Sequence, residues 1–472
     1  MRNIIMSIIT NTDSYKVGQY RQIPPGTEYT SSYIESRGGK WDKTQFIGLQ
    51  MFSQEYLSMP ITKYDIDEAS EIFHLHLPEM SDGSVFNHAG WKHILGKHGG
   101  YLPLAINAVP EGIVLPGRNV LVQITNTDPA VPWLTTYVET SILRAIWYPT
   151  TIATSDWHVK QVIRKYLETT SDENIENDLL FSLHDFGSRG VSSKESAGIG
   201  GIAHLINFRG TDNLEALLYG RKYYDSKMPG FSIHASEHST VTIWGGPDKE
   251  IDAMRNMHNV FGGNGSTFAF VSDSYDIFEA CKKWGAMNKE IQASGSKLVI
   301  RPDSGKPVER VVLNVVNALM HEFGWIANKK GYAELPPHVS VIQGDGINPA
   351  MIEKILFTLK DNRISTNTVS FGMGGGLLQD VNRDDLQFAM KMSAAKVDGK
   401  WRDVYKNPIG DPNKASKKGR LELIYSNGEY DTIRVEDEHT KTSMRMLQPA
   451  YLNGEILRSQ TLDEIRALGD DV

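Results

Sequence analysis

The middle of the chain alternates between short apolar or β-branched runs and segments with apolar residues at helical spacing. Seven such runs between residues 180 and 379 end in the polar loops LHDFGSRG, INFRGTD, FSIHASEHS, FAFVSDSYD, LVIRPDSG, VSVIQGDG and VSFGMGGG. Helical periodicity follows several of them, at residues 277–293, 308–323 and 350–362. Strands that alternate with helices form parallel sheets through βαβ crossovers. The pattern therefore predicts a parallel sheet, and the number of repeats favours a closed barrel.

The polar loops contain nearly all of the Asp, Arg, His and Gly clusters in this part of the chain. In (β/α) barrels the chemistry is carried by the loops that follow the carboxyl ends of the strands. We therefore expect the functional site at that edge of the predicted sheet.

The flanking segments follow a different pattern. Residues 101–109 and 119–125 are strand-like runs between Pro/Gly turns, and helices are predicted at 132–147 and 155–169. A hairpin is predicted from 421–426 and 430–435, with its turn at Asn427-Gly428. The predicted fold class is α/β. An irregular (β/α) barrel-like catalytic domain spans about residues 151–384, and residues 1–150 and about 385–472 form an additional mixed α/β domain.

Composition narrows the class of protein. The 472 residues carry a net charge of -8, which argues against nucleic-acid and membrane-surface partners, because both are polyanions. Cys281, the single cysteine, permits no intrachain disulfide and fits a reducing compartment. The apolar run at residues 4–9 is shorter than a signal-peptide core, and nothing approaches a membrane span. We expect a soluble cytoplasmic protein.

Two motifs have competing interpretations. GIGGIA, from Gly198, matches the dinucleotide pattern G-x-G-x-x-A, but no strand leads into it, so a helix-packing glycine cluster is the better interpretation. HASEH, from His234 to His238, matches the inverted zinc-peptidase motif H-x-x-E-H, which needs both histidines on one face of a helix. The neighbouring Pro229-Gly230 and the β-branched TVTIW make a long helix there unconvincing.

Several loops are suited to binding phosphate. The glycines of QGDG and GMGGG allow backbone N–H groups to approach an anion, and tight turns at a barrel rim are the alternative. In IRPDSG, Arg301 is placed to clamp a phosphate and Asp303 to hold Mg²⁺ or a ribose hydroxyl, unless the two form a plain surface ion pair. The basic segment DPNKASKKGR at 411–420 reads as a solvated loop when taken alone. The residues by themselves predict a barrel enzyme that acts on a phosphorylated substrate.

These stretches, taken in order, resemble the nicotinamide phosphoribosyltransferases, which are type II phosphoribosyltransferases related to the nicotinate enzymes. The resemblance rests on TDSYK (12–16), HDFGSRGVSSKESAGIG (184–200), FRGTD (208–212), EHST (237–240), SDSYDI (272–277), IRPDSG (301–306), QGDG (343–346), GGGLLQ (374–379) and DPNKASKKGRLEL (411–423). It extends from about residue 11 to DEIR at 463–466.

The resemblance implies the reaction of nicotinamide with phosphoribosyl pyrophosphate (PRPP) to give nicotinamide mononucleotide (NMN) and pyrophosphate, a step of NAD salvage. It also implies a homodimer with shared active sites. ATP would serve as co-substrate through a phosphohistidine. Mg²⁺ would be required, bound through the phosphates and Asp303.

It further implies roles for individual residues. Phe186 and the partner subunit's Tyr15 would stack on the pyridine ring, and Asp212 would accept a hydrogen bond from the carboxamide. His238 would be phosphorylated, oriented by Glu237 and close to Asp273. The ribose phosphate would be bound by Arg189, Arg301, Gly344, Gly374 and Gly375. The ribose hydroxyls or the metal would be bound by Asp303 and Asp345. The pyrophosphate and the ATP phosphates would be bound by Arg383, Lys391, Lys406 and Lys414.

Some positions depart from the family, and three alternatives stay open. Ser188 stands where the family often has an aromatic residue, His234 and Ser236 are unusually polar, and Met373 is unusual in the glycine loop. The alternatives are a nicotinate phosphoribosyltransferase, a zinc peptidase built on HASEH, and a catalytically silent nucleotide-sensing protein. For Asp212, the alternative role is that of a cap for a helix beginning near residue 213.

Overall fold

The computed structural model describes residues 7–77, 85–172, 175–410, 414–437 and 443–470. The first residues of the apolar run at 4–9 and of the basic segment at 411–420 lie outside these ranges. The chain divides into two compact units. The first comprises residues 1–154, 223–225 and 382–472, and the second comprises 155–222 and 226–381.

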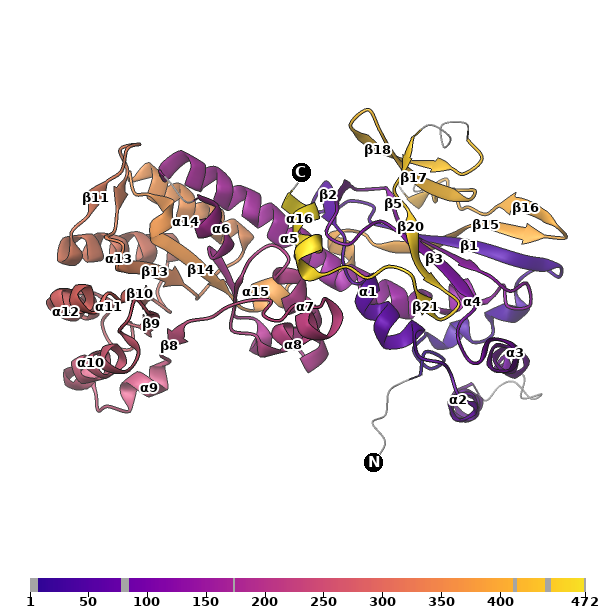
Figure 1. The fold of residues 1–472 in the computed structure, drawn as a ribbon, viewed down its shortest axis with the longest axis horizontal. Helices are drawn as coiled ribbons and strands as arrows, with labels where there is room; N and C mark the ends of the chain where they lie inside the picture. The colour runs from indigo at the N-terminus through magenta and orange to yellow at the C-terminus, as the bar shows by residue number, and fades with distance from the viewer. Residues whose placement is uncertain (1–6, 78–84, 173–174, 411–413, 438–442, 471–472) are drawn as a thin grey trace. The chain divides into compact units, whose positions relative to one another are not determined.

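The second unit is built on a parallel sheet. Its described residues form seven strands in the order β7-β6-β14-β13-β10-β9-β8 (Figure 1). These strands are β6 (Leu183–Asp185), β7 (Gly210–Thr211), β8 (His234–Ala235), β9 (Thr267–Val271), β10 (Lys297–Arg301), β13 (Val339–Gln343) and β14 (Val369–Met373). Each strand lies in one of the seven predicted repeats, although β7 begins after the apolar Ile206–Phe208 stretch rather than within it.

The sheet is a half-barrel rather than the predicted closed barrel. Its edge strands β7 and β8 have two residues each, too few for a continuous ladder between the two edges. A single parallel bridge joins Gly210 in β7 to Phe231, just before β8.

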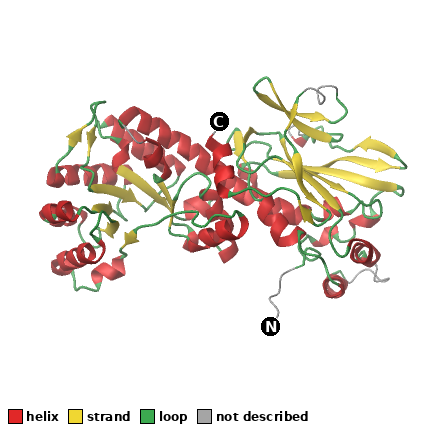
Figure 2. Ribbon diagram, viewed as in Figure 1, coloured by secondary structure: helices red, strands yellow, loops and turns green. Residues whose placement is uncertain are grey.

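Helices cover the outside of this sheet, as Figure 2 shows. The α-helices of the second unit are the second half of α5 (Glu139–Thr170), α6 (Ile175–Leu180), α7 (Lys194–His204), α8 (Leu214–Tyr223), α9 (His238–Thr242), α10 (Glu250–Phe261), α11 (Ile277–Ala286), α12 (Asn288–Ser294), α13 (Val308–Phe323), α14 (Pro349–Asp361) and α15 (Gly375–Leu378). A small hairpin pairs β11 (Ile326–Ala327) with β12 (Ala333–Glu334). In α13, Val308, Val312, Val316 and Leu319 are buried at helical spacing, which explains why this face packs inward.

The first unit contains an antiparallel sheet in the order β16-β15-β1-β5-β3-β20-β21. Its strands and those of its smaller sheets are β1 (Thr27–Glu35), β2 (Lys43–Gln45), β3 (Leu104–Ala108), β4 (Val114–Pro116), β5 (Val120–Asn126), β15 (Ala389–Val397), β16 (Lys400–Asp403), β17 (Leu421–Ser426), β18 (Glu429–Arg434), β19 (Met444–Arg445), β20 (Gln448–Leu452) and β21 (Glu455–Ile456). Its helices are α1 (Leu49–Phe52), α2 (Lys63–His76), α3 (His88–His98), α4 (Leu134–Tyr137), the first half of α5 (Glu139–Thr170), and α16 (Leu462–Asp470).

The C-terminal hairpin is confirmed. Strands β17 and β18 pair from Leu421↔Arg434 to Ser426↔Glu429. Asn427 and Gly428 both have positive φ, 54° and 86°. Two consecutive residues with positive φ make the type I′ turn that matches the twist of a hairpin, which explains the Asn-Gly signal.

Two helix predictions are corrected. The helices expected at 132–147 and 155–169 are largely one helix, α5, which runs through Pro149. Pro149 has no N–H for the Ala145 carbonyl, and Gly48 passes so close to that oxygen that a Cβ there would lie 2.4 Å from it. The segment expected at 277–293 divides into α11 and α12 at Met287.

Within the described ranges, no helix is both long enough and apolar enough to cross a bilayer.

Candidate active site

The barrel residues predicted for the site all lie at the carboxyl ends of the parallel strands. Because parallel strands end at one edge of the sheet, these residues share that edge. They are Phe186 and Arg189 after β6, Asp212 after β7, Glu237 and His238 after β8, Asp273 after β9, Arg301 and Asp303 at the end of β10, Gly344 and Asp345 after β13, and Gly374 and Gly375 after β14.

Phe186 is held by the neighbouring strand and by two glycines. Its backbone N–H donates to the Met373 carbonyl at 3.0 Å, and its ring packs against the apolar floor of the sheet. A Cβ on Gly372 would lie 2.0 Å from Phe186 Cε2, and one on Gly344 would lie 3.5 Å from the same atom. The glycines therefore make room for an aromatic ring at this edge.

A cavity of about 350 Å³ runs along the inner face of the half-barrel. Phe186, Asp212 and Arg301 line it at the carboxyl ends of the strands, and Lys297 and Ser340 line it near their amino ends. The end of the cavity at the predicted site is therefore polar, and its walls come from the sheet and from α5 and α6.

Asp212 faces this cavity and does not cap the next helix. Its carboxylate accepts a hydrogen bond from the Ser232 hydroxyl, and its backbone N–H donates to the Asp185 carbonyl at 3.0 Å. The cap at the start of α8 comes from Asn213, whose Oδ1 accepts from Ala216 N at 3.4 Å. The helix-cap alternative for Asp212 is therefore wrong, and its carboxylate is available to a ligand.

His238 begins the short helix α9 and is 46% exposed. Its Nδ1 pairs with the Ser274 hydroxyl at 2.9 Å, and its Nε2 lies 3.5 Å from Asp303 Oδ2 and 3.9 Å from Asp273 Oδ1. The predicted proximity to Asp273 is present. The expected orienting residue differs, because Glu237 accepts from the Ser239 hydroxyl, and the hydrogen bond to the ring comes from Ser274.

Asp273 organises the loop beside His238. One of its carboxylate oxygens, Oδ2, accepts from Asp303 N at 2.9 Å and from the Ser304 hydroxyl at 2.5 Å. The other, Oδ1, is buried without a hydrogen-bond partner among the described residues, as is Nε of Arg301. Asp273 Oδ1 lies 3.9 Å from His238 Nε2 and Arg301 Nε lies 4.0 Å from Asp303 Oδ1, so the ion pair considered for Arg301 and Asp303 is present. Both atoms still lack a hydrogen bond that a ligand would supply.

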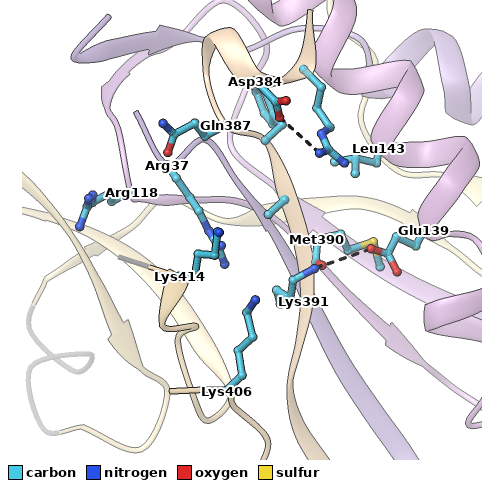
Figure 3. Close-up of a pocket in the computed structure, with 13 residues that line it drawn as sticks. Arg37, Arg118, Glu139, Leu143, Asp384, Gln387, Met390, Lys391, Lys406 and Lys414 are labelled. Carbon is cyan, nitrogen blue, oxygen red and sulfur yellow. Dashed lines mark hydrogen bonds and ion pairs between the residues drawn. The ribbon is translucent and has the colours of Figure 1, made fainter. Parts of the chain in front are cut away.

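A second cavity, of about 700 Å³, lies within the first unit and is strongly basic (Figure 3). The four cations predicted to bind phosphates, Arg383, Lys391, Lys406 and Lys414, all line it. Arg37 and Arg118 also line it, and sequence reasoning missed both. Burial lowers the pKa of Lys391 and outweighs the opposing effect of Glu139, so an anion in this cavity would stabilise its charged form.

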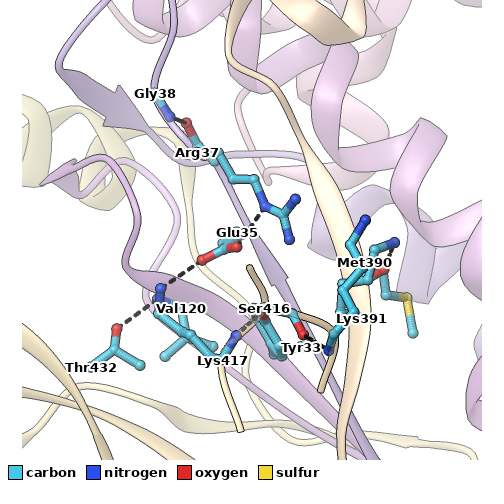
Figure 4. A network of polar contacts seen from close by, with 12 residues as sticks. Tyr33, Glu35, Arg37, Gly38, Val120, Met390, Lys391, Ser416, Lys417 and Thr432 are labelled. Carbon is cyan, nitrogen blue, oxygen red and sulfur yellow. Dashed lines mark hydrogen bonds and ion pairs between the residues drawn. The ribbon is translucent and has the colours of Figure 1, made fainter. Parts of the chain in front are cut away.

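A buried carboxylate braces the wall of this basic cavity (Figure 4). Glu35 is 3% exposed and accepts from Arg37 Nε and Lys417 Nζ, each at 2.8 Å. The Tyr33 hydroxyl accepts from Lys417 N at 2.9 Å, and burial with the nearby Glu35 charge raises the pKa of Tyr33 to about 12. This network fixes both Arg37 and the chain next to Lys414.

The two competing motifs are also placed. GIGGIA lies within α7, where a Cβ on Gly198 would meet the Tyr219 ring at 2.3 Å, so these glycines serve helix packing. In HASEH, His234 is in β8 and stacks on Phe261, whereas His238 starts α9, so they do not share a helical face. Within the described ranges, neither belongs to a cluster that could hold a metal ion. The zinc-peptidase alternative is therefore wrong.

Sequence reasoning missed Ser274, Ser232, Arg37 and Arg118. Ser274 lies inside the recognised SDSYD stretch and Ser232 inside FSIHAS, so their motifs were visible but their roles were not. Arg37 and Arg118 carry no motif, and only the packing of β1, β5 and β15 brings their loops to one cavity.

We expect acid to destabilise the protein through His184, which lines the cavity of the half-barrel. Burial lowers the pKa of His184 from 6.5 to about 4. As the pH falls below about 6.5, His184 therefore binds a proton in the unfolded chain but stays neutral in the folded chain. At pH 5 this linkage removes about 2 kcal/mol of unfolding free energy.

Urea unfolding at pH 7 and pH 5 measures this effect. His184→Gln keeps an N–H donor for the Phe181 carbonyl, which His184 Nε2 contacts at 2.9 Å, and it should lose about 2 kcal/mol less than the wild type. Equal losses in the two proteins would contradict the assignment.

Known protein families and relatives match this chain over most of its length. The profile of the Nicotinate phosphoribosyltransferase (NAPRTase) family matches residues 181–455, and that of the Nicotinamide phosphoribosyltransferase N-terminal domain matches residues 7–106. A nicotinamide phosphoribosyltransferase of Xanthomonas campestris pv. campestris is 48% identical and covers 98% of both chains. One from Acinetobacter baylyi is 30% identical and covers 96% of this chain and 95% of its own.

Solved structures show the same fold. Nicotinate-nucleotide pyrophosphorylase from Pyrococcus furiosus superposes with a TM-score of 0.61 at 16% identity, covering 100% of this chain and 96% of its own. Human nicotinic acid phosphoribosyltransferase gives 0.54 at 14% identity, covering 97% and 92%.

Proposed function

This chain belongs to the nicotinate phosphoribosyltransferase family, and on that premise we propose that it transfers the phosphoribosyl group of PRPP to nicotinamide, giving NMN and pyrophosphate. The observation that carries the choice of nicotinamide is the Asp212 carboxylate, which faces the cavity beside Phe186 and is not used as a helix cap. This reaction is a step in the salvage of nicotinamide into NAD.

The chemistry needs positioning more than proton transfer. The ring nitrogen of nicotinamide attacks C1 of the ribose with its own lone pair, the C1–O bond to pyrophosphate breaks, and the electron pair leaves with pyrophosphate. The pyridine nitrogen carries no proton, so no base has to remove one. Phe186 holds the ring, and Asp212 accepts a hydrogen bond from the carboxamide NH₂. Such orientation supplies a large share of the rate enhancement.

The negative charges of the ribose phosphate and of the pyrophosphate leaving group require cations to bind them. The ribose phosphate is bound by Arg301 and Arg189 and by the backbone at Gly344, Gly374 and Gly375. Nε of Arg301 is buried without a hydrogen bond among the described residues. The basic cavity of Arg383, Lys391, Lys406 and Lys414 binds pyrophosphate or ATP phosphates. Cations that hold the pyrophosphate would stabilise the charge that develops on the leaving group.

Carboxylates near the ribose suit Mg²⁺. The unpartnered, buried Asp273 Oδ1 and the nearby Asp303 are oxygen ligands of the kind that Mg²⁺ takes, and Asp345 follows β13 at the same edge. When bound, Mg²⁺ would neutralise phosphate charge that these carboxylates otherwise repel. Asp303 and Asp345 also accept hydrogen bonds from ribose hydroxyls.

His238 is the proposed phosphoryl acceptor when ATP is the co-substrate. The Ser274 hydroxyl occupies Nδ1, which leaves Nε2 to form the N–P bond as the terminal phosphoryl group of ATP leaves ADP. We expect ATP to leave an acid-labile phosphate that is lost in His238→Ala, while basal NMN formation persists at reduced efficiency. The matched control is His234→Ala, which should keep the label. Full labelling of His238→Ala would exclude this role.

The active site is proposed to be shared in a homodimer. Tyr15 is 63% exposed, which suits a ring that completes the site of another subunit. Inactive Tyr15→Ala and Phe186→Ala chains, mixed and purified as heterodimers, should regain activity because one of the two sites then has both rings. Verified heterodimers with no more activity than either parent would argue for sites within single chains. The proposed location is the cytoplasm, in keeping with the buried free thiol of Cys281.

A further inference from the structure

Two histidines and an aspartate of the first unit converge on one point, and none of them has a role in the reaction proposed above. His93 and His98 come from the second half of α3, and Asp128 follows β5. The Nε2 atoms lie 2.8 Å (His93) and 2.7 Å (His98) from Asp128 Oδ2. One ligand atom from each residue lies within 4.8 Å of the other two.

The carboxylate is held in a fixed orientation by its own loop. Asp128 is 3% exposed, its Oδ1 accepts from Ala130 N at 3.0 Å, and its main-chain oxygen accepts from Asn126 Nδ2 at 2.8 Å. Oδ2 is therefore directed at the two imidazoles, which are 33% and 19% exposed. Preorganised ligands of this kind lower the cost of binding an ion.

Two imidazole nitrogens and one carboxylate oxygen form a ligand set typical of zinc. Tetrahedral ligands at about 2.0 Å from the ion are roughly 3.3 Å apart, so each imidazole nitrogen would move about half an ångström away from Asp128 Oδ2 to admit an ion. His93 also lines an open cavity of about 520 Å³ with Asn87 and Trp133, through which water can reach a fourth position. We propose that His93, His98 and Asp128 bind a divalent transition metal of the zinc class, which fastens the end of α3 to the loop after β5.

Lys97 gives the proposal a distinctive consequence. Its ammonium lies 2.9 Å from the same Asp128 Oδ2, and the side chain is 57% exposed. A bound cation would compete with this amine and displace it into solvent. Removing the amine should therefore tighten metal binding, whereas it would loosen a cluster held only by hydrogen bonds and ion pairs.

The test uses the full-length protein, freed of metal by a chelator and titrated with Co²⁺ as a visible-light probe and with Zn²⁺ by calorimetry. We expect one ion per chain. His93→Gln and His98→Gln should each weaken binding by at least about a hundredfold, and Lys97→Gln should strengthen it. His88→Gln, at the start of the same helix, is the matched control and should bind as the wild type does.

Absence of binding to the wild type, or wild-type affinity in both His93→Gln and His98→Gln, would overturn the proposal. The test replaces the partly exposed His93 and His98 and leaves the buried Asp128 in place. Circular dichroism verifies that the variants are folded. NMN formation is expected to be unchanged in His93→Gln, because this residue lies outside the catalytic and binding machinery.

Discussion

Asp212→Asn should lose most of the preference for nicotinamide over nicotinate. The carboxylate accepts a hydrogen bond from a carboxamide NH₂ but meets the carboxylate of nicotinate as a like charge. At a separation of about 4 Å and an effective dielectric constant near 20, this repulsion is about 4 kcal/mol, or up to about a thousandfold in relative kcat/KM. Asparagine removes the charge and keeps the shape, so the ratio of the two kcat/KM values should fall steeply.

Glu215→Gln is the matched control for this prediction. Glu215 is an acidic residue in the first turn of α8, close in sequence to Asp212 but absent from the lining of the half-barrel cavity. Its neutralisation changes the net charge equally and should leave the substrate ratio where it was. If folded Asp212→Asn retains the wild-type ratio, Asp212 does not set specificity.

Gly372→Ala should reduce kcat/KM for nicotinamide by about a hundredfold. The new methyl group would lie 2.0 Å from Phe186 Cε2, so the ring must leave its place on the sheet. Displacing a positioning group by about an ångström costs on the order of a hundredfold in rate. Overpacking should also lower the unfolding free energy by about 1–3 kcal/mol.

Gly263→Ala separates this effect from the general cost of changing a glycine. No heavy atom lies within 4 Å of a Cβ at Gly263, and this residue is outside both cavities. Its steady-state kinetics should match the wild type. Wild-type kinetics in Gly372→Ala as well would show that the Phe186 ring does not need this position for catalysis.

The sequence located the parallel strands and the loops that carry the chemistry. An apolar run followed by a polar Gly/Asp loop is local information, and all seven strands of the half-barrel fall within such repeats. Local chemistry likewise fixed the Asn427-Gly428 turn, because few residues other than asparagine and glycine adopt positive φ easily. The sequence around Pro149 did not show that one helix continues through it, and in the fold Gly48, from a distant part of the chain, packs against that helix.

The sequence identified single residues of the site, whereas the tertiary structure determined which residues lie next to them. Motifs in the sequence identified Phe186, Asp212 and His238, because each lies in a stretch whose spacing resembles a known family. The partners of these residues depend on which loops the tertiary structure brings together. Ser274 rather than Glu237 contacts His238, and Asn213 rather than Asp212 caps α8. Arg37, Arg118 and the His93, His98 and Asp128 cluster carry no spacing signal at all, because side chains far apart in the chain become neighbours only when strands and helices pack.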